Sequence, residues 1–288
     1  TTVRGRKDLK NLNVPFLGEI PFSVSSKNRP TLEQRIRFWK KPKEVRMIVV
    51  KAGKRDIVNE AFRVLRTNFE FTIGTHPEQN VIVFTSFNPG SGKTHLASNM
   101  AMSLAIKKKK VLLIDGDLRH GSTSMLIHSP GEGLSDYLNG RISDIHDILY
   151  KGEENGLVKN FDMIPIGTIP PNPTELLSTP LLEQMIQTMR QEYDYVFIDC
   201  PPIEVVADTP IYEQFADRTI FVVRAGLMER SMLPEIDALY KEKKFKNMTL
   251  ILNGTKARGG RYGSHYGYGY GYGYGYNYNK EKNGGAKS

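Results

Sequence analysis

The sequence predicts an α/β fold in which helices cover both faces of a doubly wound, mostly parallel sheet. Three apolar runs, at residues 81–84, 111–114 and 195–198, predict buried strands. Between them lie segments whose apolar residues recur at helical spacing, as expected of helices that pack on a sheet. This alternation favours a parallel sheet, because parallel neighbours need a long connection that is usually helical.

Residues 1–55 form a basic segment ahead of the main domain. They contain fifteen lysines and arginines but only four acidic residues, a formal net charge of +11, whereas the whole chain carries +9. We interpret this segment as juxtamembrane or as a linker, because basic residues beside a membrane are attracted to anionic lipid. A nucleic-acid arm is the alternative. Within the segment, the apolar residues 14–22 are expected to lie against the core without regular structure.

Residues 56–69 predict an amphipathic helix, and with it we begin the main domain, placed at residues 56–254. The apolar positions from Ile57 onward share one broad face of the helix. Glu60, Arg63 and Arg66 recur every three residues along another face. A solvated face with local ion pairs explains such a stripe. A contact surface is the alternative.

A glycine-rich turn joins the strand at residues 81–84 to the next helix. Gly90 and Gly92 would let a phosphate approach backbone N–H groups at the start of that helix. Lys93 can then reach the outer phosphates, and Thr94 offers a hydroxyl to Mg²⁺. Phe87 stands where such loops usually have their first glycine. The alternative is a glycine-rich turn with a surface lysine.

Aspartates follow the other two strong strands. Asp115 and Asp117 follow the second strand and Asp199 ends the third. In an extended chain, residues two apart point to the same side, and the carboxyl ends of parallel strands form the edge where ligands bind. The three aspartates therefore favour metal binding or proton transfer. Cys200 is expected to be a buried small residue rather than a nucleophile.

The rest of the chain predicts further strands at residues 161–167, 219–223 and 248–253, and a helix at residues 179–191. Residues 255–288 cannot build a core, because they lack aliphatic residues and alternate glycine with tyrosine, so we expect a flexible tail. The tail contains eight tyrosines: Tyr262, Tyr266, Tyr268, Tyr270, Tyr272, Tyr274, Tyr276 and Tyr278. It is either a low-complexity segment that associates non-specifically or a source of accessible phenol groups.

Composition narrows the class of protein. With 288 residues, 39% of them hydrophobic, the chain can bury one substantial core. The single cysteine excludes an internal disulfide and suits a reducing compartment. No apolar run approaches the roughly 18 residues that cross a bilayer, so we expect this part of the protein to be soluble.

Taken together, these motifs resemble those of the bacterial tyrosine kinases of capsule and exopolysaccharide export, over nearly the whole chain. Residues 86–94, with Pro89 and without the first glycine, look like the modified Walker A motif of that family. Residues 114–119 are similar to its Walker A′ motif and residues 197–202 to its Walker B motif.

Three further features carry the same resemblance. The stripe of Glu60, Arg63 and Arg66 is similar to the family's ring-forming motif, residues 170–177 to a recurring segment, and the tail to its tyrosine cluster. The chain departs from the family at Ser91, where these kinases often carry Glu, and in the strict Gly-Tyr alternation of its tail.

The resemblance implies a P-loop NTPase fold of the deviant Walker type and a protein-tyrosine autokinase that uses ATP and Mg²⁺. It implies that Lys93, Asp115 and Asp117 are catalytic, and it leaves open whether Asp115 or Asp117 deprotonates the phenol. The implied ATP-binding residues are Pro89, Gly90, Ser91, Gly92, Lys93, Thr94 and His95. The implied Mg²⁺ ligands are Thr94, Asp117 and Asp199.

The resemblance also implies partners and a location. The chain would phosphorylate its tail in trans within a homo-oligomeric ring, for which an octamer is one candidate size, and would regulate polysaccharide polymerisation and export. An upstream transmembrane chain-length-regulator domain or partner, a cognate tyrosine phosphatase and the cytoplasmic face of the bacterial inner membrane are implied; no nucleic acid is expected. The alternatives are a membrane-cued partitioning ATPase and a nucleotide-switched assembly scaffold, neither of which labels tyrosine.

Overall fold

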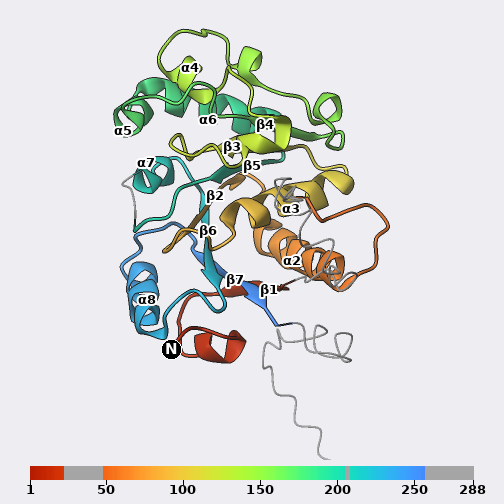
Figure 1. Ribbon diagram of the computed structural model, residues 1–288, viewed down its shortest axis with the longest axis vertical. Helices are drawn as coiled ribbons and strands as arrows, with labels where there is room; N and C mark the ends of the chain where they lie inside the picture. The colour runs from red at the N-terminus through yellow and green to blue at the C-terminus, as the bar shows by residue number, and fades with distance from the viewer. Residues whose placement is uncertain (23–47, 205–207, 257–288) are drawn as a thin grey trace, which may run out of the picture. The chain divides into compact units, whose positions relative to one another are not determined.

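The computed structural model describes residues 1–22, 48–204 and 208–256, and its centre is a seven-stranded sheet (Figure 1). The strand order is β1-β7-β6-β2-β5-β3-β4, and every neighbouring pair is parallel. The strands are β1 (Phe16–Pro21), β2 (Val81–Ser86), β3 (Val111–Asp115), β4 (Phe161–Ile164), β5 (Tyr195–Asp199), β6 (Arg218–Arg224) and β7 (Thr249–Thr255). The predicted fold class is confirmed.

Helices connect the strands and cover both faces of the sheet (Figure 1). The α-helices are α2 (Ile57–Ile73), α3 (Lys93–Ile106), α4 (Leu134–Leu138), α5 (Pro173–Leu177), α6 (Pro180–Glu192), α7 (Thr209–Glu213) and α8 (Leu233–Lys241). Short 3-10 turns are η1 (Arg6–Leu9), η3 (Ser124–Ile127), η4 (Ile145–Ile148), η5 (Gly152–Asn155) and η6 (Arg230–Met232).

Each face of the sheet has its own hydrophobic core. In β2, Ile82 and Phe84 belong to the core under α2 and α3, whereas Val81 and Val83 belong to the core under α6. Alternate residues of a strand point to opposite faces, so a strand covered on both sides must be apolar at every position. This two-sided burial explains why the central strands stand out as unbroken apolar runs in the sequence.

The N-terminal apolar segment is a strand, not the irregular segment that was expected. β1 pairs in parallel with β7, and Leu17 and Ile20 are buried in the core under α2. Asn68 of α2 donates a hydrogen bond from Nδ2 to the carbonyl oxygen of Leu17 at 2.8 Å. The prolines and glycine of this segment lower its strand propensity, and only tertiary contacts with β7 and α2 outweigh that preference. Part of the basic segment 1–55 is therefore built into the sheet.

Helix α2 begins at a side-chain cap. Asp56 accepts a hydrogen bond from the backbone N–H of Asn59 at 2.9 Å. Burial raises the pKa of Asp56, but hydrogen bonds from Asn59 and Lys54 outweigh it and hold the pKa at about 2. Ile57, expected on the buried face, is 45% exposed, and Phe71 is 83% exposed. The helix thus presents apolar as well as charged side chains to solvent.

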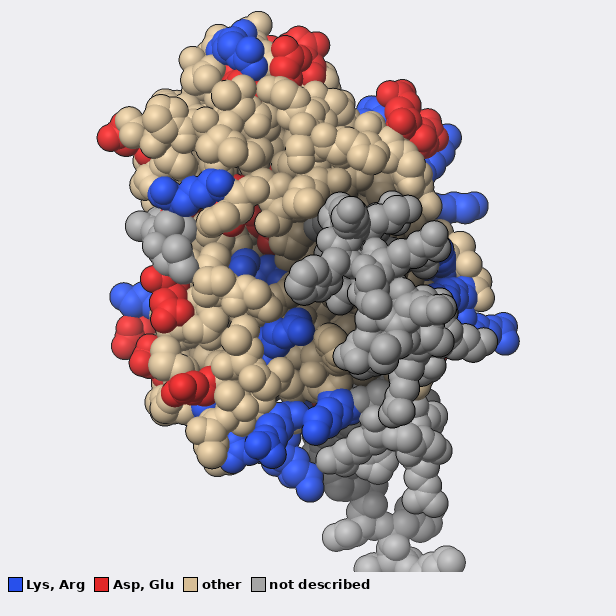
Figure 2. Space-filling view, viewed as in Figure 1, with Lys and Arg blue, Asp and Glu red and all other residues tan. Residues whose placement is uncertain are grey.

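Across the three described ranges, no helix is both long enough and apolar enough to cross a bilayer. Basic side chains gather at the lower edge of the face seen in Figure 2, in the region of the N-terminal segment. The eight tail tyrosines lie outside the described residues, as do residues 23–47.

Candidate functional site

The glycine loop, residues 87–92, links the carboxyl end of β2 to the start of α3. Gly90 has φ 73° and Gly92 has φ 92°, in the left-handed region that favours glycine. A Cβ on Gly92 would lie 2.1 Å from Nδ2 of Asn253, whereas a Cβ on Gly90 would meet nothing within 4 Å. Gly92 caps α3 without a side chain. The first N–H groups of a helix have no intrahelical partner, so this loop presents them to an anion.

Polar contacts from both sides hold the glycine loop in shape. The carbonyl oxygen of Asn88 accepts hydrogen bonds from Ser86 Oγ at 2.9 Å and Ser91 Oγ at 2.8 Å. Asn253, on β7, donates from Nδ2 to the carbonyl oxygen of Ser91 at 2.9 Å. Phe87 packs edge to face on Phe221, with 6.0 Å between ring centroids. This aromatic contact anchors the loop at the position where a first glycine is missing.

Asp199 is the buried carboxylate of the site. Its Oδ2 accepts hydrogen bonds from Thr94 Oγ1 at 2.5 Å and from Thr123 Oγ1 at 2.6 Å. Its Oδ1 is buried and has no hydrogen-bond partner among the described residues. Burial raises the pKa of Asp199, and the two threonines and Lys93 oppose that shift. A buried carboxylate oxygen without a partner, beside a threonine hydroxyl, fits the oxygen ligands that Mg²⁺ prefers.

Lys93 lies at the first position of α3, half-buried beside the aspartates. Burial lowers the pKa of its ammonium group, while the negative charges of Asp199 and Asp117 raise it. The structure therefore brings together Lys93, Thr94 and the two aspartates that the sequence placed at this edge. Pro89 is exposed at the tip of the loop, and the ring of His95 packs edge to face on Phe62 at 5.9 Å.

Asp115 is fully buried, and both of its oxygens accept hydrogen bonds. Oδ2 accepts from the backbone N–H of Ser124 at 2.7 Å and from its Oγ at 2.6 Å, and Oδ1 accepts from the N–H of Asp117 at 3.3 Å. Burial, and then the neighbouring Asp199, raise the pKa of Asp115 to about 7. Asp115 thus shapes the turn that follows β3, and its own side chain does not reach the surface.

Asp117 has a different environment from Asp115. Its side chain is 16% exposed and lies 3.1 Å from His120 Nδ1. The expectation that both aspartates point to the same side applied to an extended chain, but β3 ends at Asp115. Because the backbone turns after β3, Asp117 reaches toward solvent while Asp115 stays inside. Of the two, Asp117 is the one accessible to a ligand.

Arg119 ties this turn to the segment at residues 170–177. Its Nη2 donates to Thr174 Oγ1 at 3.1 Å, and its Nε lies 3.5 Å from Oδ2 of the buried Asp208. Thr174 donates from Oγ1 to Asp208 Oδ1 at 2.6 Å. Nothing in the local sequence marks Asp208, since its partners lie more than thirty residues away. Cys200, near the same edge, is buried as expected, and burial raises the pKa of its thiol.

Glu60, Arg63 and Arg66 of α2 do not share one environment. Glu60 and Arg63 form an ion pair at the surface, with side chains 52% and 34% exposed. Arg66 is only 16% exposed, and its Nη1 donates to the carbonyl oxygen of Ser103 in α3 at 2.9 Å. The outer part of the stripe is open to a partner, whereas Arg66 joins α2 to α3 within the chain.

Comparisons with known proteins agree with this geometry. The protein family described as "AAA domain" matches residues 79–226, the part that contains β2 to β6. The putative tyrosine-protein kinase AmsA of Erwinia amylovora is 31% identical over 256 residues, which are 88% of this chain but 33% of that protein. The tyrosine-protein kinase CpsD of Streptococcus agalactiae is 33% identical over 72% of this chain and 87% of its own.

Among solved structures, the kinase domain of the Escherichia coli tyrosine kinase ETK aligns with a TM-score of 0.74 and 30% identity, covering 94% of this chain and all of that one. The chain spans about a third of the length of the first curated relatives that it matches. It covers most of CpsD and the whole of the ETK kinase domain. The matched domain and relatives indicate a P-loop fold that binds nucleotides. The chain belongs to the bacterial tyrosine-protein kinase family.

Proposed function

We propose that the chain transfers the γ-phosphoryl group of MgATP to tyrosine hydroxyls, including those of its own tail. The observation that carries this proposal is the buried Oδ1 of Asp199, which lacks a hydrogen-bond partner among the described residues and lies beside Thr94 and Lys93. A buried carboxylate oxygen of this kind calls for a cation. A cation next to a helix N-terminus suits a nucleotide phosphate.

Each residue of the site would have a distinct task. Lys93 and the backbone N–H groups of Gly90, Ser91, Gly92 and, at the start of α3, His95 would hold the phosphates, and Pro89, which has no N–H, would shape the loop. Thr94 and Asp199 would hold Mg²⁺, which when bound neutralises charge on the phosphates, and Asp117, the third implied ligand, would face the phenol instead. In the transfer, the phenol oxygen bonds to the γ-phosphorus, the bond from that phosphorus to the bridging oxygen of ADP breaks, and the phenol proton passes to a carboxylate.

We assign the carboxylate that faces the phenol to Asp117 rather than Asp115. Asp115 has no exposed surface, and both of its oxygens already accept hydrogen bonds. Asp117→Asn should lower tyrosine phosphorylation by roughly 10²- to 10⁴-fold, the usual contribution of a general base, with little change in Tm. Asp115→Asn should instead lower Tm, because an amide NH₂ placed against the Ser124 donors leaves them unsatisfied.

Thermal unfolding and phosphate incorporation, measured on both variants, separate these roles. Thr174→Ser, which keeps the hydroxyl that donates to Asp208, is a control for small changes near the site. If Asp117→Asn kept wild-type phosphorylation while Asp115→Asn folded normally and lost it, the assignment would have to be reversed.

We propose that the exposed pair Glu60 and Arg63 contacts a second copy of the chain in a ring. Reversing the charge in Arg63→Glu should then lower the mass measured by light scattering, because arginine pairs well with a neighbour's carboxylate. Lys244→Glu, an equal charge change at a side chain 61% exposed beyond α8, should leave the mass unchanged. The main expected effect of Arg66→Ala is a lower Tm, because the change removes the contact with Ser103 within the chain. Oligomers that persist in Arg63→Glu would mean that this face is simply solvated.

The cellular role is also a proposal, because the chain spans about a third of its first relatives. The function would be control of polysaccharide polymerisation and export at the cytoplasmic face of the bacterial inner membrane. An upstream transmembrane domain or partner and a tyrosine phosphatase would complete the system. The basic N-terminal segment, with a net charge of +11 over residues 1–55, supports a position beside anionic lipid.

Mass spectrometry of the purified chain after incubation with MgATP tests the proposed activity. We expect phosphate on the tyrosines between Tyr262 and Tyr278. Release of inorganic phosphate without phosphotyrosine would support a partitioning-type ATPase instead. Nucleotide-dependent assembly without turnover would support a scaffold.

A further inference from the structure

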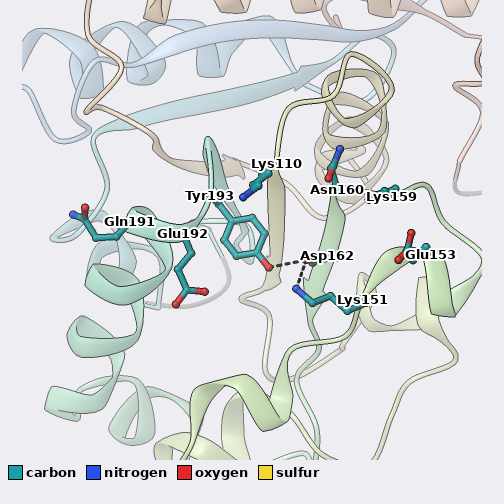
Figure 3. A pocket seen from close by; sticks show the side chains of 9 residues that line it. All are labelled: Lys110, Lys151, Glu153, Lys159, Asn160, Asp162, Gln191, Glu192 and Tyr193. Atoms are coloured by element: carbon teal, nitrogen blue, oxygen red, sulfur yellow. Dashed lines mark hydrogen bonds and ion pairs between the residues drawn. The ribbon is translucent and has the colours of Figure 1, made fainter.

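Figure 3 shows a polar pocket of about 550 Å³, whose lining residues place it at the opposite edge of the sheet from the glycine loop. Lys110, Asn160 and Tyr193, which line it, come just before β3, β4 and β5. Asp115 and Asp199 end two of the same strands. Five residues of strand at about 3.3 Å each put roughly 16 Å between the two edges. The pocket is therefore separate from the site described above.

The floor of the pocket is an acidic side chain whose charge is already matched. Asp162 accepts hydrogen bonds from Tyr193 Oη at 2.7 Å, Lys151 Nζ at 2.9 Å and the N–H of Gly152 at 3.1 Å. Glu192, at the side, lies 2.9 Å from Nε2 of His146. Burial raises the pKa of the Tyr193 phenol, and its bond to Asp162 raises it further, so this hydroxyl stays a donor to the floor. Lys151 offsets the charge of Asp162, and His146, when protonated, offsets that of Glu192.

The ammonium groups of the pocket have spare capacity. Lys110 and Lys159 form no ion pair within the described ranges, and Lys151 gives one of its three N–H groups to Asp162. In Figure 3, Lys110 and Lys151 point toward the space beside the ring of Tyr193, and the carboxylate of Glu153 lies away from them. The pocket thus combines several lysine donors with one aromatic wall.

We propose that this pocket binds a phosphate monoester. A phosphate dianion carries about −1.5 to −2 charges near pH 7 and accepts several hydrogen bonds, which matches a set of lysines better than a carboxylate would. A volume of about 550 Å³ is in the range of small-molecule sites and leaves room for the organic group beside Tyr193. The ester has two possible sources: a phosphotyrosine, which rests on the proposed function, or a free alkyl phosphate, which does not.

The test is an NMR titration of the full Lys93→Met chain in the presence of MgADP. This variant is expected to have lost phosphoryl transfer, so it does not consume the ligand. Phenyl phosphate represents phosphotyrosine, and glucose 6-phosphate represents a free alkyl ester. Either ester should shift the amide signals of Gly152, Asn160 and Tyr193. Selective binding of phenyl phosphate would assign the pocket to phosphotyrosine, and binding of both esters, or of glucose 6-phosphate alone, would assign it to phosphate esters in solution.

A matched pair of variants checks the site. Lys110→Gln and Lys159→Gln should each weaken the affinity about three- to tenfold. Lys108→Gln should leave the affinity unchanged, because Lys108 does not line the pocket. This substitution removes the same charge from the same run of lysines and is therefore the matched control. Absence of pocket shifts with both esters at millimolar concentration, or equal weakening in Lys108→Gln, would overturn the proposal. Neither result depends on whether the chain phosphorylates tyrosine.

Discussion

Lys93→Met is expected to reduce tyrosine phosphorylation by the chain at least 10²- to 10³-fold, with Tm close to that of the wild type. The ammonium group of Lys93 lies in the field of Asp199 and Asp117, which oppose the effect of burial on its pKa. These negative charges favour the cationic form of Lys93 at the point where phosphate charge develops. Methionine keeps the length and apolar stem of lysine, so the loss is mainly one of charge.

The same variant tests whether phosphorylation occurs in trans. Lys93→Met chains mixed with active chains that end at Ala257 should become labelled on their own tails, since the truncated chains have no tail tyrosines to label. The readout is phosphotyrosine by mass spectrometry, with Lys244→Met as a control for loss of an exposed lysine. Wild-type labelling of Lys93→Met alone would refute the assigned site. If the mixture stayed unlabelled while the wild-type chain labelled its own tail, the assigned site would stand and transfer would occur in cis.

Gly92→Ala is expected to abolish nucleotide binding, whereas Gly90→Ala should retain most of it. Both positions have positive φ, so both variants carry a backbone strain of roughly 1–2 kcal/mol. Only at Gly92 does the new Cβ collide, at 2.1 Å from Nδ2 of Asn253. The clash would push the start of α3 or Asn253 out of position, and with it the N–H groups that face the phosphates.

Titration with a fluorescent ADP analogue measures this difference, and thermal unfolding shows whether each variant folds. Gly92→Ala combined with Asn253→Ala should recover part of the affinity, because the second change removes the atom that is struck. The recovery would be incomplete, since Asn253 also donates to the carbonyl oxygen of Ser91. Equal losses in Gly90→Ala and Gly92→Ala would show that strain, not the collision, determines the effect.

The sequence predicts the central part of this fold well because burial on both faces leaves a clear pattern. The runs that became β2, β3 and β5 are apolar throughout and end at the polar residues of the site. β1 was not predicted as a strand, because Gly18 and Pro21 lie within it and its partner β7 lies more than 200 residues away. A strand that depends on distant partners has no local signature.

The sequence predicts the part of the candidate site that lies at the carboxyl ends of the parallel strands. Thr94 and Asp199 meet because β2 and β5 are neighbours and, like all strands of a parallel sheet, have their carboxyl ends at one edge. The contacts of Asn253 with Ser91 and of Thr123 with Asp199, which join residues 162 and 76 positions apart, were not predicted from the sequence. The burial of Asp115 depends on where β3 ends, and spacing alone does not reveal a strand's last residue.

Both outer strands of the sheet resist extension by another chain. In β1 the pairing with β7 shifts register near Gly18 and again at Pro21, and proline has no N–H to offer a new strand. At the far side, Tyr150 forms an antiparallel bridge with Met163 of β4, and their backbone N–H and carbonyl groups bond at 2.9 Å. Within the described residues, Pro21 and the bridge between Tyr150 and Met163 therefore interrupt the rows of N–H and carbonyl groups on which another strand could pair. An interface made of side chains, unlike an added strand, can close on itself with a defined number of subunits.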